Sequence, residues 1–310
     1  MNGEHAAYRR QMMSRFAAYR DAQFAGQDSL FDPAPGHEHV FRPEHAERNL
    51  FDPELGDLLP GRRHRWFAAM SSSQALALSI FGTIIKRSGA STLAALPDER
   101  GALLLPDFAP AGEPLFDYPV TYLGEPRPTQ VDFYLPGKWG NVAIECKLGE
   151  SEWGACSQVP VRCDGNYAVE AGPKRGQRCT LSARGVQYWQ YLPRLFLWQA
   201  DVDYRPCPIR EPYQLVRNVL AAAVSPGSDE IVGLPVAMLV CDARNPVFAP
   251  GGSANTQFLA VRSALWGPAS VRRTTWQDIA RALRTGGGFE DLLTWLEEKY
   301  GIVPDGGREP

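Results

Sequence analysis

The sequence predicts an α/β protein in which helices flank a mixed β-sheet. Two alternating runs rich in β-branched and aromatic residues, 131–135 and 142–147, are separated by a short connection containing Gly137 and Gly140, which indicates a hairpin. A continuous apolar run at 234–241 is typical of a strand covered on both faces. Segments with helical spacing lie between these strands, as expected for a small α/β core with a mixed sheet.

The N-terminal third is expected to begin with an amphipathic helix over residues 4–25. Residues 26–65 are rich in Pro, Gly, Asp and His and predict a mostly irregular arm. The serines at 71–73 are N-cap candidates for an apolar helix over residues 74–86. A first strand is expected over residues 117–122, leading into the hairpin.

A polar, glycine-rich insert is expected after the hairpin, over residues 149–180. Helices are predicted over 181–199, which contains many aromatic residues, and over 213–223. After the buried strand, residues 258–261 are expected to add one more strand.

The C-terminal region predicts two helices, 274–283 and 289–299, joined by the three glycines at 286–288. Thr274 or Thr275 is the expected N-cap of the first. These patterns divide the chain into four parts: an N-terminal helix and arm (1–65), a core containing the insert (66–285), a C-terminal helix (286–303) and a flexible tail (304–310).

Composition argues against several classes of protein. The 310 residues carry a formal net charge of −3, which argues against coating nucleic acid through bulk charge, although a nuclease needs only a locally basic surface. The first residues lack the apolar core of a signal peptide, and no window approaches the ~20 apolar residues of a membrane span. Six cysteines in such a chain indicate a reducing cytosol, with free thiols or a metal site. We therefore expect a cytoplasmic location and no membrane partner.

The hairpin register brings charged residues together. Pairing about the turn places Asp132 opposite Glu145, and Lys147 follows on the same face. The other face is apolar through three cross-strand pairs: Leu135 with Val142, Phe133 with Ile144, and Val131 with Cys146.

Opposed carboxylates of this kind repel each other unless a cation lies between them. Mg²⁺ prefers carboxylates, a backbone carbonyl and water as ligands, so Asp132, Glu145 and the Cys146 carbonyl form a candidate metal site. Lys147 adds a compact positive charge suited to orienting a water or stabilising a phosphate. The alternative is a solvated face on which Lys147 offsets Glu145. The apolar opposite face and the register favour the metal site.

Pro128-x3-Asp132 with Glu145-Cys146-Lys147 resembles the signature of the PD-(D/E)XK nuclease superfamily, which has the restriction-endonuclease-like fold. The resemblance implies that Asp132 and Glu145 bind Mg²⁺, with Mn²⁺ as the alternative ion, and that Lys147 serves the hydrolytic water. Val131 rather than Pro precedes the Asp. Three further segments look similar to bacterial restriction-type members: 72–76, 213–218 and 241–246.

Three more residues are candidates for assisting the site. Gln187 and Tyr191 form a Gln-x3-Tyr pair on one helical face, which resembles a motif of the RecB-type branch, and core packing is the alternative. Gln74 lies where members of the superfamily often place Glu or Gln at the start of the first core helix.

Two groups are candidate nucleic-acid contacts. Gln214, Arg217 and Asn218 share one helical face and are residue types that commonly contact phosphates, although a solvated polar face is an equal alternative. The basic cluster at 174–178 is the preferred contact with the phosphate backbone, because a glycine-flanked loop presents it near the hairpin. Its charged members are Lys174, Arg175 and Arg178.

Four cysteines lie after the hairpin in the polar part of the chain: Cys156, Cys163, Cys179 and Cys207. Four cysteines in loops could form a tetrahedral zinc site. Their spacing lacks the tight C-x2-C pair of zinc knuckles, so unligated thiols are the favoured state.

The resemblance as a whole implies a Mg²⁺-dependent deoxyribonuclease acting on DNA in restriction or defence, with a repair exonuclease as the alternative. A hypothesis from another class is a catalytically silent DNA-binding or interaction module of the same fold. Cutting both strands with one site per chain calls for two copies, so a homodimer is a further expectation.

Overall fold

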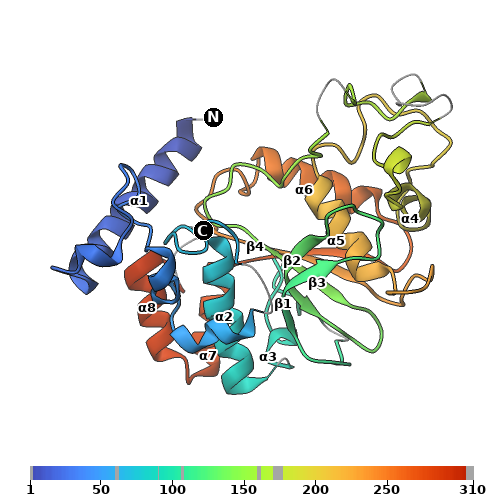
Figure 1. Cartoon of the computed structure of the whole chain (residues 1–310). Coiled ribbons are helices and arrows are strands. Elements are labelled where there is room, and N and C mark those ends of the chain that lie inside the picture. The colour runs from blue at the N-terminus through green and yellow to red at the C-terminus, as the bar shows by residue number, and fades with distance from the viewer. Residues whose placement is uncertain are drawn as a thin grey trace.

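The computed structural model describes residues 3–59, 63–89, 91–105, 108–158, 162–169 and 177–304. At its centre lies one five-stranded sheet with strands in sequence order (Figure 1). The first three strands are antiparallel to their neighbours, and the last three are parallel. The strands are β1 (Leu115–Val120), β2 (Thr129–Leu135), β3 (Val142–Cys146), β4 (Val236–Cys241) and β5 (Ser270–Thr275). The predicted α/β class with a mixed, helix-flanked sheet is confirmed.

The hairpin pairs in the predicted register, with Phe133 opposite Ile144 and Leu135 opposite Val142. The prediction for Val131 is wrong, because its side chain packs on the opposite face of the sheet from Phe133. Alternation along β2 breaks where its pairing with β1 skips Asp117, a residue with a left-handed φ of 51°. The second face of the hairpin is therefore largely buried, and its charged part is confined to one end.

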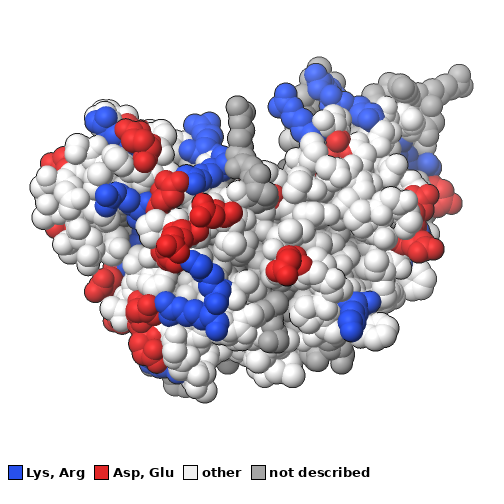
Figure 2. All heavy atoms as spheres, turned by 60° about the horizontal axis from the view of Figure 1, so that its bottom comes forward, with Lys and Arg blue, Asp and Glu red and all other residues white. Residues whose placement is uncertain are grey.

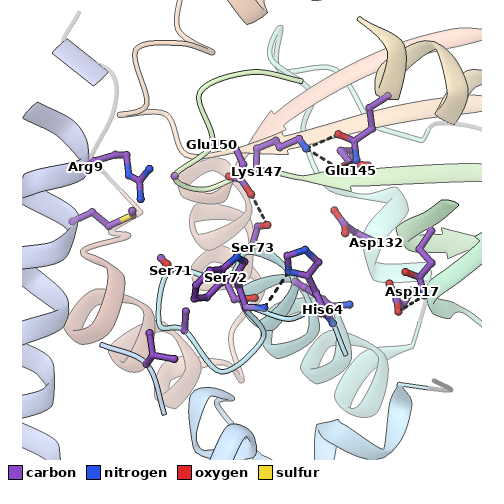
Figure 3. Close-up of a pocket in the computed structure, with 18 of the residues that line it drawn as sticks. Arg9, His64, Ser71, Ser72, Ser73, Asp117, Asp132, Glu145, Lys147 and Glu150 are labelled. Atoms are coloured by element: carbon purple, nitrogen blue, oxygen red, sulfur yellow. Dashed lines mark hydrogen bonds and ion pairs between the residues drawn. The ribbon is translucent and has the colours of Figure 1, made fainter. Parts of the chain in front are cut away.

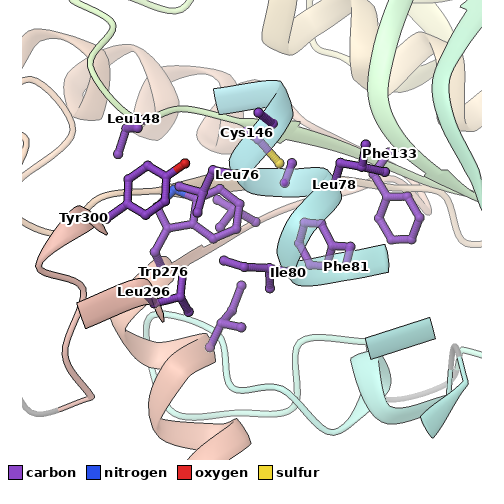
Figure 4. Close-up of a cluster of buried hydrophobic side chains, with 14 of the residues drawn as sticks. Leu76, Leu78, Ile80, Phe81, Phe133, Cys146, Leu148, Trp276, Leu296 and Tyr300 are labelled. Carbon is purple, nitrogen blue, oxygen red and sulfur yellow. The ribbon is translucent and has the colours of Figure 1, made fainter. Parts of the chain in front are cut away.

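One face of the sheet is covered by α2 (Ser73–Ser88), α7 (Trp276–Gly286) and α8 (Glu290–Tyr300). Apolar residues recur along α2, and almost its whole length is buried. Ser72 caps it, accepting a hydrogen bond from the Ala75 backbone N–H at 3.2 Å. Figure 4 shows α2 side chains packed between the sheet residues and the aromatic rings of the C-terminal helices.

The other face is covered by α5 (Tyr213–Ala223) and α6 (Ser253–Ala264), with α4 (Tyr188–Leu195) beside them. α5 packs directly on β3 and β4. This places the first turns of α5 above the end of β3, where the charged part of the hairpin lies (Figure 1).

The N-terminal region folds back against the C-terminal helix. α1 (Gly3–Gln23) packs on α8, where Phe16 meets Tyr300 edge to face at 5.7 Å between ring centroids. The predicted irregular arm contains three short 3-10 helices: η1 (Asp28–Leu30), η2 (Pro43–Asn49) and η3 (Pro53–Leu58). Side chains of α1, the arm, α2 and α8 share one hydrophobic cluster.

Several predicted elements differ from the structure. Residues 258–261 lie inside α6, because Ala254, Phe258 and Val261 have helical rather than strand spacing. The helix predicted over 181–199 is reduced to α4, preceded by η5 (Ser182–Arg184). The strand β5 was not predicted, because its Ser-Val-Arg-Arg-Thr-Thr sequence is polar for a strand.

The remaining helices agree closely with prediction. Thr275 caps α7, accepting a hydrogen bond from Asp278 N–H at 3.0 Å. A short helix that was not predicted, α3 (Ser91–Ala94), follows α2. Most of the predicted tail lies outside the described residues, which end at Pro304. Within the described part of the chain, no helix is long and apolar enough to cross a membrane.

Candidate active site

A cavity of about 660 Å³ opens where β2 begins and β3 ends (Figure 3). Its floor is formed by the hairpin residues Asp132, Glu145 and Lys147, which the sequence predicted to lie together. Its walls come from the start of α2, the first turns of α5, the loop after β3, α1 and the N-terminal arm. Segments distant in the sequence thus converge on the predicted charged end of the hairpin.

Glu145 and Lys147 form a buried ion pair. Lys147 Nζ lies 2.9 Å from Glu145 Oε1, and both side chains are less than a tenth exposed. The backbone of Lys147 is fixed on both sides, because its N–H donates to Val240 O at 2.8 Å and its carbonyl accepts from Trp276 Nε1 at 3.0 Å. The ammonium group is therefore held at the cavity floor by rigid elements.

Asp132 lies on the neighbouring strand with its carboxylate facing the cavity (Figure 3). Its Oδ2 accepts a hydrogen bond from the Cys146 N–H at 2.8 Å, which ties it across the hairpin. Burial raises the pKa of Asp132 well above its ordinary value, and the nearby charge of Glu145 raises it further. The two carboxylates therefore repel each other across the hairpin, as the sequence predicted.

Lys147 remains a cation in this setting. Burial lowers its pKa, but the carboxylates of Glu145, Glu150 and Asp132 outweigh burial and hold it above the ordinary value. A charged ammonium has donors and no acceptor. Lys147 can therefore donate hydrogen bonds to a water or a phosphate oxygen, and it cannot take up a proton.

Two α5 residues predicted as phosphate contacts instead hold Glu145. Gln214 Nε2 donates to Glu145 Oε1 at 2.5 Å, and Asn218 Nδ2 donates to Glu145 Oε2 at 2.8 Å. Gln214 Oε1 in turn accepts from Lys147 Nζ at 2.7 Å. Because the two residues are one helical turn apart, a single helix positions both members of the ion pair.

Arg217, the third predicted contact on α5, lines the cavity and is 4% exposed. One of its terminal nitrogens donates to Gln130 O and Asn218 Oδ1, both at 3.3 Å. Its Nε is buried and has no hydrogen-bond partner. A buried guanidinium with unused donor capacity beside a cavity is suited to receiving an anion.

The sequence analysis missed a third carboxylate, that of Asp117 on β1. It lines the cavity and accepts a hydrogen bond from Gln130 Nε2 at 2.7 Å. Burial raises its pKa to about 6, which a hydrogen bond with Gln74 partly opposes. The available signal was an acidic residue inside an otherwise apolar strand, with Phe116 before it and Tyr118 after it.

Gln74 reaches the cavity from the start of α2, as its position in the resemblance implied. Its Oε1 accepts from the backbone N–H of His64 at 3.2 Å, so it also links α2 to the arm. Glu150, which was not among the predicted site residues, lines the cavity as well. It accepts from Ser73 Oγ at 2.7 Å and from Leu148 N–H at 2.5 Å.

The segment after β4, one of those that resemble restriction-type proteins, fixes the loop that carries Glu150. Asn245 Nδ2 donates to Leu148 O at 2.9 Å and to Glu150 O at 3.0 Å. The buried Asp242 accepts from Tyr8 of α1 at 3.0 Å and is paired with Arg244. This segment therefore supports the cavity wall and attaches α1 to it.

The N-terminal region forms a wall that sequence reasoning did not anticipate. The cavity is lined there by basic and aromatic side chains: Arg9, His37, His39, His64 and Trp66. In Figure 3, His64 lies between the serines at the start of α2 and Asp132, whereas Arg9 lies across the cavity beside α1. Contacts of this kind depend on how the arm folds back, which local patterns do not encode.

Other predicted site residues lie elsewhere. Gln187 and Tyr191 are not among the described residues lining the cavity; Tyr191 bonds to Gln187 at 3.4 Å and to Asp229 at 2.9 Å. Arg178 pairs with Asp203 at 2.6 Å. Lys174 and Arg175 fall outside the described residues.

The donor atoms at the cavity floor fit a hard divalent cation. Asp132 and Glu145 line the floor and, with the backbone carbonyl of the adjacent Cys146, would supply only oxygen, as Mg²⁺ prefers. The raised pKa of Asp132 reflects burial and the charge of Glu145. The Cys146 side chain points the other way, into the core under α2. As the side chains stand, the described residues contain no group of three His, Cys, Asp or Glu arranged to hold a metal ion. Only two acidic side chains and a carbonyl are involved here, so the remaining ligands would be waters or phosphate oxygens.

A mixed sheet flanked by helices, with an Asp and a Glu-x-Lys pair on one hairpin, defines a protein of the restriction-endonuclease-like class. A family model described as "Restriction Endonuclease associating with ARP" matches residues 37–301, and the chain belongs to this family. No curated protein and no solved structure matches the chain.

Proposed function

We propose that this protein is a Mg²⁺-dependent nuclease that hydrolyses DNA phosphodiester bonds as a restriction or defence endonuclease. The observation that carries the proposal is the joint placement of Asp132, Glu145 and Lys147 at the floor of one large cavity. Membership in a restriction-endonuclease family supports the choice of reaction and of DNA as partner.

Asp132, Glu145 and the Cys146 carbonyl would hold the ion. When bound, Mg²⁺ lowers the pKa of a water and neutralises charge on the phosphate. Gln214 and Asn218 keep the Glu145 carboxylate oriented. Lys147 donates to the attacking water or to a phosphate oxygen, where a fixed cation stabilises the negative charge that develops.

DNA binding is expected to depend on contacts around the cavity. The face in Figure 2 shows lysine and arginine interspersed with acidic residues and a broad uncharged area. Such a face does not offer a continuous basic surface. Arg217 and the basic side chains of the N-terminal wall are the contacts that we assign to phosphates.

The test is cleavage of unmodified plasmid and linear duplex DNA by the full chain, with Mg²⁺ or with EDTA. We expect cleavage only with Mg²⁺, and its loss in Glu145→Gln, which keeps the shape of the side chain and removes its charge. The matched control is Glu298→Gln on the exposed side of α8. Equal cleavage by wild type and Glu145→Gln would refute the assignment.

One observation favours the silent-module alternative. Both carboxylate oxygens of Glu145 already have protein partners, in Lys147, Gln214 and Asn218. If this network replaces an ion rather than positioning one, the protein should bind DNA equally with Mg²⁺ and with EDTA, and should not cut it. Binding and cleavage measured on the same DNA therefore distinguish the two functions.

A further inference from the structure

The four loop cysteines meet at one place in the fold. Cys156, Cys163, Cys179 and Cys207 all line a single small cavity beneath the insert. Each is partly buried and each is a free thiol. They come from four segments spread over more than fifty residues, so their spacing alone does not indicate that they converge.

The four side chains converge on a narrow space, because the cavity that they line has a volume of only about 20 Å³. The described arrangement is therefore a cluster of four thiols rather than separate loop cysteines.

The cysteine-bearing segments are joined by few backbone hydrogen bonds. Cys156 N–H donates to Arg210 O at 2.8 Å, and Cys207 N–H donates to Gly165 O at 2.9 Å. Between β3 and α5, the described residues contain only η5 and α4 as helices and no named strand. A region with so little regular structure gains most from a cross-link that joins its segments.

We propose that Cys156, Cys163, Cys179 and Cys207 bind one structural Zn²⁺ ion that holds the insert together. Four cysteines with no open position form a closed tetrahedral site, which is structural rather than catalytic. No three of these side chains are arranged for ligation in the described conformation, so the proposal requires them to turn toward the ion when it binds.

This site is separate from the proposed active site. The two cavities have no lining residue in common among the described residues. Whether the protein binds zinc is therefore independent of whether it is a nuclease, and zinc binding can be measured without any DNA.

The experiment is elemental analysis of the full chain, expressed without a metal-affinity tag and dialysed against metal-free buffer. We expect about one zinc per chain and no iron. Cys163→Ser and Cys207→Ser should each lose most of the zinc, whereas Cys241→Ala, at a buried cysteine of β4 outside the cavity, should retain it. Co²⁺ substituted into the wild type should give the visible spectrum of tetrahedral thiolate ligation.

Wild-type protein that contains no zinc, takes up neither Zn²⁺ nor Co²⁺, and keeps its unfolding temperature in a strong chelator would overturn the proposal. Iron in place of zinc would overturn it equally. These outcomes rest on wild-type protein, so they remain decisive if a cysteine variant fails to fold.

Discussion

Glu145 receives hydrogen bonds from two side chains of α5 and an ion pair from its own strand segment. Repulsion between the opposed carboxylates, taken alone, predicts that removing Glu145 leaves the fold unharmed. The structure argues differently, because Glu145→Ala would leave Lys147 as a buried charge without its principal partner. Loss of one member of a buried pair typically costs about 3–5 kcal/mol. Glu145→Gln removes the same charge but keeps the side-chain volume and one acceptor oxygen for the surrounding donors, so it perturbs the site less than Glu145→Ala.

Gln214 is a positioning residue in this arrangement, because it bonds to both Glu145 and Lys147. We expect Gln214→Ala to slow single-turnover DNA cleavage by about 10-fold or more, from the loss of one or two hydrogen bonds to charged groups. DNA affinity should change little, and Gln214→Glu should not restore the rate, since it cannot donate to Glu145. A parallel loss of affinity and rate would instead make Gln214 a DNA contact.

Asp117 gives the site a pH dependence that can be measured without DNA. Its pKa is raised from 3.8 to about 6 by burial, so the folded protein binds its proton more tightly than the unfolded chain does. The resulting stabilisation is fully present below about pH 4 and is lost as pH rises through about 6. At pH 7, Asp117→Asn should therefore be more stable than wild type by about 1–2 kcal/mol.

Urea unfolding in EDTA between pH 4 and pH 8 measures this effect. The wild type should lose stability across the range relative to Asp117→Asn, and the exposed control Asp57→Asn should follow the wild type. If Asp117→Asn and wild type show parallel profiles, Asp117 titrates normally.

At the scale of elements, the hairpin was predictable because its alternation and its short glycine-containing turn fix one register. That register places Asp132, Glu145 and Lys147 without further information. The helices α2, α5, α7 and α8 were predictable from their apolar spacing and, for α2 and α7, from Ser and Thr caps. β5 was not, since tertiary pairing with β4 decides its conformation.

The partners of the site depend on packing between elements, which sequence patterns do not specify. Gln214 and Asn218 were correctly placed on one helical face, but their role followed only once α5 was seen to cross β3. Glu150 and the histidines of the arm reach the cavity through loops held by distant residues such as Asn245.

The packing of α1 on α8 makes the first helix part of the core. Phe16 is fully buried against Tyr300, so Phe16→Ala should lower the free energy of unfolding by about 3–5 kcal/mol. The control Leu197→Ala, at a side chain 62% exposed, should lie within about 0.5 kcal/mol of wild type. Chemical denaturation of both variants checks this, and a Phe16→Ala cost as small as the control's would mean that α1 is only loosely attached.

At the scale of the whole molecule, the N-terminal and C-terminal segments enclose the site together. α1 and the arm supply one wall of the cavity, while the hairpin and α5 supply its charged floor. The same α1 is anchored by α8, near the C-terminal end of the family match at residue 301. Access to the hairpin is therefore set by segments that lie far from it in the sequence.

The central claim is that the opposed carboxylates form a divalent-cation site, and Mn²⁺ binding tests it most directly. Electron paramagnetic resonance counts free Mn²⁺ during a titration of the full chain without DNA. The account predicts saturable binding of Mn²⁺ by wild type, competition by Mg²⁺, and loss of this binding in Asp132→Asn. Binding that is unchanged in Asp132→Asn, or no binding by wild type at millimolar Mn²⁺, would contradict it.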